Sequence, residues 1–117
     1  MLNKDYLTLC LIENQKIKSE SLAKLTWGNY SCIDRENSLV YIKPSGVDIN
    51  SITPDDISVV DLNCNQFSGL KFSIDTPIHI ELYKSMPHIK SICHNHSTYA
   101  TSFAQANRNI QMYGTTH

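Results

Sequence analysis

The sequence lacks any long hydrophobic run, and no stretch approaches the roughly 20 apolar residues that a membrane-spanning helix requires. It also lacks the opening of a secretory signal peptide, because charged residues interrupt its first turns and no small-residue cleavage site follows. We therefore expect a cytoplasmic protein with no membrane partner.

An excess of charge of one sign is missing as well. The 117 residues include 10 basic and 11 acidic side chains, which gives a net charge of −1. The basic surface that nucleic-acid-binding proteins need is absent, so we expect no nucleic-acid partner. A small phosphate-bearing ligand is compatible with this balance, because it requires only a local site.

Cysteine is scarce, and Cys10, Cys32, Cys64 and Cys93 form no Cys-x-x-Cys pair. Their spacing argues against a disulfide framework or a zinc ribbon and favours reduced, buried thiols. Cys93 precedes a pair of histidines, but alternation along a strand would point it away from both imidazoles. We interpret it as a core residue.

Apolar periodicity and turn signals predict a single domain built on a mostly antiparallel sheet. Helices are expected at residues 2–25, from about 76 to Pro87, and at 99–106, and strands after the Gly28-Asn29 pair up to 34, then at 39–42, 57–62, 66–70 and up to 94–96. Ile78, Leu82 and Met86, spaced four apart, are the expected buried face of the middle helix. We interpret His79, on another face, as a surface or core residue and not as a ligand.

Two histidines at the end of the last strand indicate a metal site. His94 and His96 are two residues apart, so strand alternation places both imidazoles on one face, where they can share a cation. Asp75 offers a carboxylate at the start of the preceding helix. A catalytic zinc needs about three protein ligands, and the alternative is a pair of partly solvated histidines at a strand end.

Two glycine-containing turns are candidate anion sites. Gly28 and Asn29 tolerate positive φ and offer backbone N–H groups, and the segment 43–46 combines Lys43, Ser45 and Gly46. Each of these turns, taken alone, is also typical of an ordinary loop.

Five motifs together resemble the class II aldolase/adducin family, and within it the L-ribulose-5-phosphate 4-epimerases. They are TWGN at 26–29, KPSGV at 43–47, DTPIHIELY at 75–83, HNHS at 94–97 and GTTH at 114–117. The resemblance implies a three-layer α/β/α fold around a mostly antiparallel sheet. It also implies a homotetramer with active sites between subunits.

The same resemblance assigns roles to nine residues. The residues that match phosphate-binding positions are Gly28, Asn29, Ser45, Gly46 and Ser73, with Lys43 beside them, and those that match the zinc centre are Asp75, His94 and His96. The implied reaction converts L-ribulose 5-phosphate into D-xylulose 5-phosphate by zinc-assisted retro-aldol cleavage and re-addition, with no organic cofactor. Asp75 favours this epimerase, because the fuculose-type aldolases typically carry glutamate there. Ile74 replaces a serine of the epimerase pattern, which removes one hydroxyl contact to phosphate.

The resemblance extends over residues 1–117 as the amino-terminal portion of one such domain, incomplete at the carboxyl end. The family's acidic proton-transfer residue, third zinc histidine and tyrosine lie beyond the GTTH motif, and His117 is not that third ligand by pattern. We therefore expect little or no activity from this chain alone, unless a complementing chain supplies the missing groups. The alternatives are a class II sugar-phosphate aldolase, which does not re-add the aldehyde, and a non-catalytic metal-binding fragment.

Overall fold

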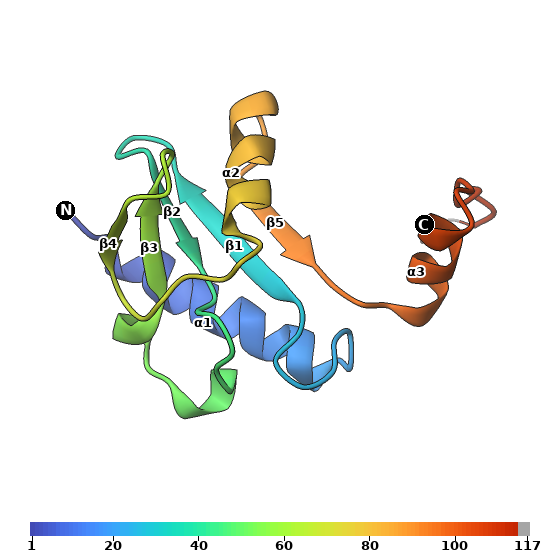
Figure 1. The fold of residues 1–117 in the computed structure, drawn as a ribbon, viewed down its shortest axis with the longest axis horizontal. Coiled ribbons are helices and arrows are strands. Elements are labelled where there is room, and N and C mark those ends of the chain that lie inside the picture. The colour runs from blue at the N-terminus through green and yellow to red at the C-terminus, as the bar shows by residue number, and fades with distance from the viewer. Residues whose placement is uncertain (115–117) are drawn as a thin grey trace.

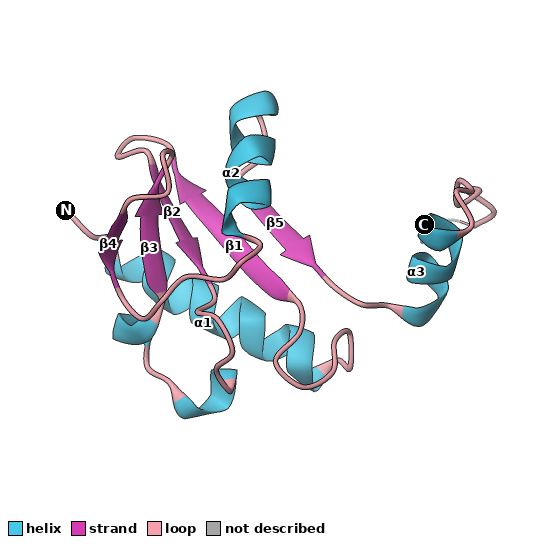
Figure 2. Cartoon of the chain, viewed as in Figure 1, coloured by secondary structure: helices cyan, strands magenta, loops and turns pink. Residues whose placement is uncertain are grey.

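The computed structural model describes residues 1–114 and has three layers, a five-stranded sheet between helices (Figures 1 and 2). The helices are α1 (Lys4–Ser19), α2 (Thr76–Ser85) and α3 (Thr98–Gln105), with short 3-10 turns at Ile49–Ser51 and Pro54–Asp56. The strands are β1 (Asn29–Asp34), β2 (Leu39–Ile42), β3 (Ser58–Asp61), β4 (Gln66–Ser68) and β5 (Ser91–His94). The α/β/α prediction is confirmed. Residues 115–117, with most of the GTTH motif and His117, lie outside the described residues.

The sheet is antiparallel throughout, with strand order β4-β3-β2-β1-β5. Strands β1 to β4 form a meander, and β5 returns after α2 to pair with β1. The first hairpin is tight because the Asp34 carboxylate accepts hydrogen bonds from the backbone N–H groups of Glu36 and Asn37, both at 3.1 Å. In the β1–β5 register, Asn29 lies opposite His94.

Helix α1 packs on one face of the sheet. Leu7, Cys10 and Leu11 meet Tyr41 and Val59 in a buried cluster, which confirms the expected amphipathic first helix. The helix is shorter than predicted, however, because the chain turns at Ser21 with a φ of 57°. The expected apolar positions beyond that turn are therefore not part of the helix.

Helix α2 packs on the opposite face, but through a different stripe from the predicted one. Ile80 and Tyr83 pack on Ile33, Val40 and Val60 of the sheet. The buried side chains of α2 are Thr76, His79, Ile80 and Tyr83. The predicted stripe of Ile78, Leu82 and Met86 was wrong, and Ile78 is 62% exposed. His79 and the Tyr83 hydroxyl are buried against Ser31 of the sheet, with which both make hydrogen bonds. Apolar periodicity does not detect such polar contacts.

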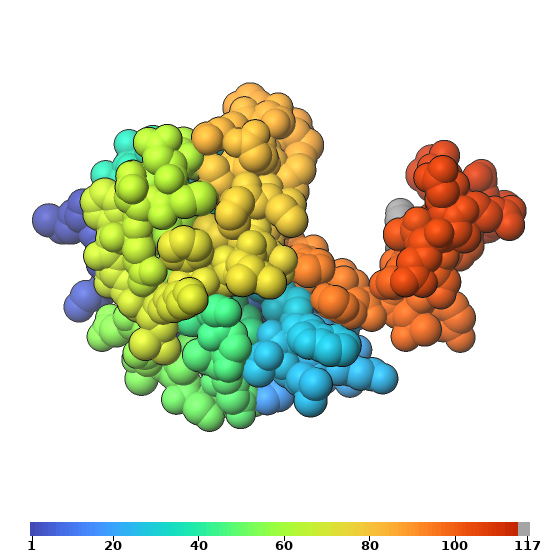
Figure 3. Space-filling model, in the orientation of Figure 1, coloured from blue at the N-terminus to red at the C-terminus, as the bar shows by residue number. Residues whose placement is uncertain are grey.

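Helix α3 lies away from the sheet at the end of an extended segment, and all of its residues are exposed (Figure 3). Strand β5 is an edge strand, so one side of it has no neighbour. Cys93 is accordingly exposed, and its interpretation as a core residue was wrong. Within residues 1–114, no helix is long and apolar enough to cross a membrane.

Candidate functional site

A cavity of about 430 Å³ opens where the beginning of β1, the end of β5 and the beginning of α2 meet the loop after β2. All nine residues singled out in the sequence line it: Gly28, Asn29, Lys43, Ser45, Gly46, Ser73, Asp75, His94 and His96. The antiparallel sheet thus gathers segments that are far apart in the chain. Their individual roles remain predictions.

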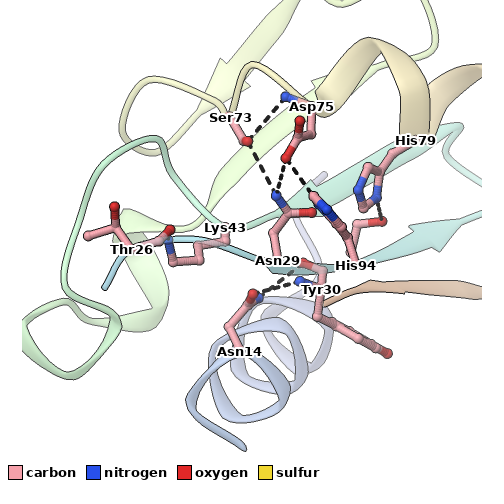
Figure 4. A network of polar contacts seen from close by, with 10 residues as sticks. Asn14, Thr26, Asn29, Tyr30, Lys43, Ser73, Asp75, His79 and His94 are labelled. Carbon is pink, nitrogen blue, oxygen red and sulfur yellow. Dashed lines mark hydrogen bonds and ion pairs between the residues drawn. The ribbon is translucent and has the colours of Figure 1, made fainter. Parts of the chain in front are cut away.

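Asn29 is the centre of a polar network in this cavity (Figure 4). Its Nδ2 group donates to Asp75 Oδ2 at 2.8 Å and to Ser73 Oγ at 3.4 Å. The Asn29 side chain is buried, and within residues 1–114 its Oδ1 atom has no hydrogen-bond partner. Because a buried carbonyl oxygen without a partner costs about 1–3 kcal/mol, the network offers an acceptor for a ligand or for further protein.

Asp75 and His94 form the adjoining contact, with 3.2 Å between Asp75 Oδ2 and His94 Nδ1 (Figure 4). A carboxylate only accepts hydrogen bonds, so Nδ1 carries the proton and Nε2 of the neutral ring keeps its lone pair. Histidines that bind metals commonly donate their other ring N–H to a carboxylate in this way. Asp75 is therefore placed to orient His94, in addition to its contact with Asn29.

His96 lies just beyond the end of β5, with its ring 5.0 Å from the His94 ring. The two imidazoles and the Asp75 carboxylate have the donor chemistry that zinc prefers. Nevertheless, the residues that the structure describes contain no group of three His, Cys, Asp or Glu side chains arranged to hold a metal ion. The three-ligand centre stays a prediction, and Asp75 is hydrogen-bonded to Asn29 and His94 in this structure.

Gly28 brings the backbone close to the end of β5. It has a φ of +73°, and a Cβ atom there would lie 3.0 Å from the His94 carbonyl oxygen and 2.8 Å from the Ala23 Cβ. Both the positive φ and the close approach require glycine. Gly28 therefore forms part of the cavity wall. A side chain at this position would push the His94 backbone away.

Lys43 is buried, although it brings an amino group to the lining of the cavity. Its Nζ donates to the Thr26 carbonyl oxygen at 2.8 Å, and burial lowers its pKa. The Ser45 N–H donates to the Lys71 carbonyl at 2.9 Å, so Ser45 contributes its hydroxyl rather than its amide. The cradle at residues 43–46 stays a prediction, and with the Ser45 N–H engaged it would use the Lys43 ammonium group and the Ser45 hydroxyl.

A second polar cluster lies behind the cavity. The Ser31 hydroxyl is 2.7 Å from His79 Nδ1 and 2.7 Å from the Tyr83 hydroxyl, and all three side chains are buried. Burial lowers the pKa of His79 to about 4, against the opposing charge of Asp75. The structure thus places His79 in the core, one of the two positions expected for it.

Four cavity residues were not predicted as site residues, namely Thr26, Trp27, Pro44 and Ile74. Trp27, Pro44 and Ile74 are each adjacent in sequence to a predicted site residue, and Thr26 lies two residues before Gly28. That proximity is the signal that marks them.

The family model for the class II aldolase and adducin N-terminal domain matches residues 13–117. The chain belongs to the class II aldolase and adducin family. This result confirms the resemblance at the level of the family.

Solved structures agree with this assignment. An L-fuculose 1-phosphate aldolase matches with a TM-score of 0.85 and 35% identity, over 92% of this chain and 51% of its own. YgbL from Klebsiella pneumoniae, described as an aldolase, epimerase or decarboxylase, matches with a TM-score of 0.80 and 25% identity, over 89% and 50%. The L-fuculose 1-phosphate aldolase from Glaciozyma antarctica PI12, at 21% identity and a TM-score of 0.79, shares the fold over 91% of this chain and 45% of its own. The chain thus spans about half the length of these structures.

Proposed function

We propose that the cavity is one half of a class II sugar-phosphate aldolase site. One observation supports this proposal. A single cavity has an ammonium group, hydroxyl groups and glycines at one end, and imidazoles and a carboxylate at the other. A ketose phosphate needs both ends, because one holds the phosphate and the other acts beside the carbonyl. The 35% identity to an L-fuculose 1-phosphate aldolase favours the aldolase over other family activities.

The phosphate end is assigned to Gly28, Asn29, Lys43, Ser45 and Gly46, with Ser73 beside them. Lys43 supplies positive charge next to a turn that is open to solvent, since a Cβ atom at Gly46 would meet nothing within 4 Å. An ammonium group in a partly desolvated site attracts an anion more strongly than one in bulk water. Charge-assisted hydrogen bonds would then fix the phosphate and orient the sugar.

The imidazole end is assigned to His94 and His96, with Asp75 orienting His94 through Nδ1. A divalent cation such as zinc, when bound there, polarises the substrate carbonyl as a Lewis acid. Asp75 keeps the His94 proton on Nδ1 and so keeps Nε2 available as a donor. Asn29 holds Asp75 in turn, so that the phosphate and imidazole ends share one hydrogen-bonded residue.

The 4-epimerase that acts on L-ribulose 5-phosphate is the second candidate. Asp75 favours it, because the fuculose-type enzymes typically carry glutamate at this position. Here the shorter side chain of Asp75 contacts His94 at 3.2 Å. Both candidates break the same kind of C–C bond next to a ketone, and they differ in whether the aldehyde is added back. Both also need proton-transfer groups, which we propose come from a segment that corresponds to the other half of the relatives, in a tetramer of complete domains.

Titration calorimetry of the purified chain with zinc tests the imidazole end directly. We expect binding that is lost in the His94→Ala/His96→Ala variant and retained in His88→Ala, which removes an exposed histidine outside the cavity. Binding that survives in the double variant would refute the assignment. Incubation of the zinc-loaded protein, together with a chain that supplies the other half of the domain, with L-fuculose 1-phosphate or L-ribulose 5-phosphate then distinguishes the candidates. The aldolase gives dihydroxyacetone phosphate and the epimerase gives D-xylulose 5-phosphate.

A further inference from the structure

His96 is not held by the sheet. Strand β5 ends at His94, and Asn95 Oδ1 accepts from the Ser97 N–H at 3.0 Å, so the chain turns immediately after the strand. Without ladder hydrogen bonds, a residue in this position would be free to move its ring by several ångströms. Something else must fix an imidazole that is to act in the cavity.

The loop between α1 and β1, residues 20–28, supplies the contacts that hold it. The His96 N–H donates to the Leu22 carbonyl oxygen at 2.8 Å. The Trp27 ring lies over the His96 ring, with 5.5 Å between the centroids and 33° between the planes. His94 completes the row, with its ring tilted 36° from that of His96.

Trp27 is itself well placed to support a neighbour. Its backbone N–H donates to the Lys24 carbonyl oxygen at 3.0 Å, and the next residue, Gly28, lies against the backbone of His94. Its side chain is nevertheless 55% exposed, which is a large apolar surface to leave in water for packing reasons alone. The Trp27 ring therefore serves to contact His96 at the edge of the cavity.

We propose that Trp27 is a positioning residue that fixes the orientation of the His96 ring at the cavity. The inference rests on the proposed function insofar as His96 is a metal donor, but the ring contact itself is independent of that role. A tilted aromatic pair of this spacing contributes enough to favour one orientation of the imidazole over the alternatives. Because the same loop continues into Gly28 and Asn29, it also joins the phosphate end of the cavity to the imidazole end.

The test uses the ring protons of His96 in NMR spectra of the metal-free protein, assigned with a His96→Gln variant. We expect an upfield ring-current shift in the natural protein, loss of that shift in Trp27→Leu, and partial retention in Trp27→Phe. Tyr99→Leu is the matched control, because Tyr99 is an exposed aromatic residue outside the cavity. His96 resonances that are identical in Trp27→Leu and the natural protein would overturn the proposal.

Zinc affinity gives the second readout. We expect Trp27→Leu to weaken zinc binding roughly 2- to 10-fold, the range that one aromatic pair contributes, and Trp27→Phe to restore most of it. A shift of the His96 resonances with unchanged zinc affinity would show a passive contact and would also overturn the proposal. If zinc does not bind the natural protein, the proposed function is refuted. The His96 resonances would still decide whether Trp27 orients the ring. Circular dichroism confirms folding, which we expect to be retained because Trp27 lies at the surface.

Discussion

The buried His79 predicts a steep loss of stability in mild acid. Burial holds its pKa at about 4 in the folded protein, below the ordinary value of 6.5 that applies when the chain is unfolded. Between these two values the unfolded chain binds a proton that the folded protein does not bind. Stability contributed by the neutral ring is therefore full above pH 6.5 and is lost as the pH falls through this window.

The structure explains why the folded protein resists this proton. When the proton of neutral His79 is on Nε2, its Nδ1 accepts from the Ser31 hydroxyl, and Ser31 in turn can accept from the Tyr83 hydroxyl, both over 2.7 Å. A charged imidazolium would donate at Nδ1 instead, which forces the whole chain of hydrogen bonds to reverse. The positive charge would also be buried near His94, and Asp75 would offset part of its cost. At about 1.4 kcal/mol for each pH unit, the difference between the two pKa values amounts to about 3 kcal/mol.

Urea unfolding followed by far-UV circular dichroism, at about pH 7 and about pH 4, measures this term. The natural protein should lose about 3 kcal/mol more than His79→Gln over this range, because glutamine does not titrate. His88→Gln, in which an exposed histidine is removed, should follow the natural protein. Equal losses in the natural protein and His79→Gln would refute the reasoning, since they would show that His79 takes up its proton without unfolding.

Four further substitutions test the geometry of the cavity and of the end of α2. Gly28→Ala should destabilise the fold by about 2 kcal/mol or more in urea unfolding, because its Cβ atom meets backbone and its φ is positive. Gly46→Ala, with positive φ but open space, should cost only about 1 kcal/mol, and equal costs would contradict the close approach. Lys43→Gln should weaken binding of inorganic phosphate about 10-fold in calorimetry, because the ammonium charge beside the Thr26 carbonyl is lost. Unchanged affinity would show that the anion binds elsewhere. Arg35→Met should lower unfolding stability by about 1–2 kcal/mol, because the guanidinium donates to three carbonyls at the end of α2, and no change would show that solvent replaces it.

The sequence was sufficient to predict the layers and nine of the residues that line the cavity, but not the other four or the contacts between them. Turn residues and apolar periodicity placed most elements, and the family motifs placed nine residues in one cavity. The buried stripe of α2 was missed because His79 is buried by a hydroxyl from β1, a long-range pairing that has no local signature. Cys93 was misplaced because alternation says which way a side chain points, and not whether anything covers that face. The contact of Asp75 with Asn29 and His94 likewise depends on the register of two strands that are distant in sequence.

That register accounts for the whole site. Asn29 and His94 are opposed in the β1–β5 ladder, and Asn29 reaches Asp75 at the start of α2, which the chain forms between the two strands. Because side chains alternate with a period of two, a slip of one residue would turn His94 away from Asn29 and bring Cys93 into its place. The thiol would then face Asp75, and the row of Trp27, His96 and His94 rings would be broken. Gly28 permits the close backbone approach of this segment to the His94 carbonyl, because a Cβ atom there would lie 3.0 Å from that oxygen. The glycine that the sequence marked as part of an anion-binding turn therefore also lets the loop before β1 lie against the end of β5.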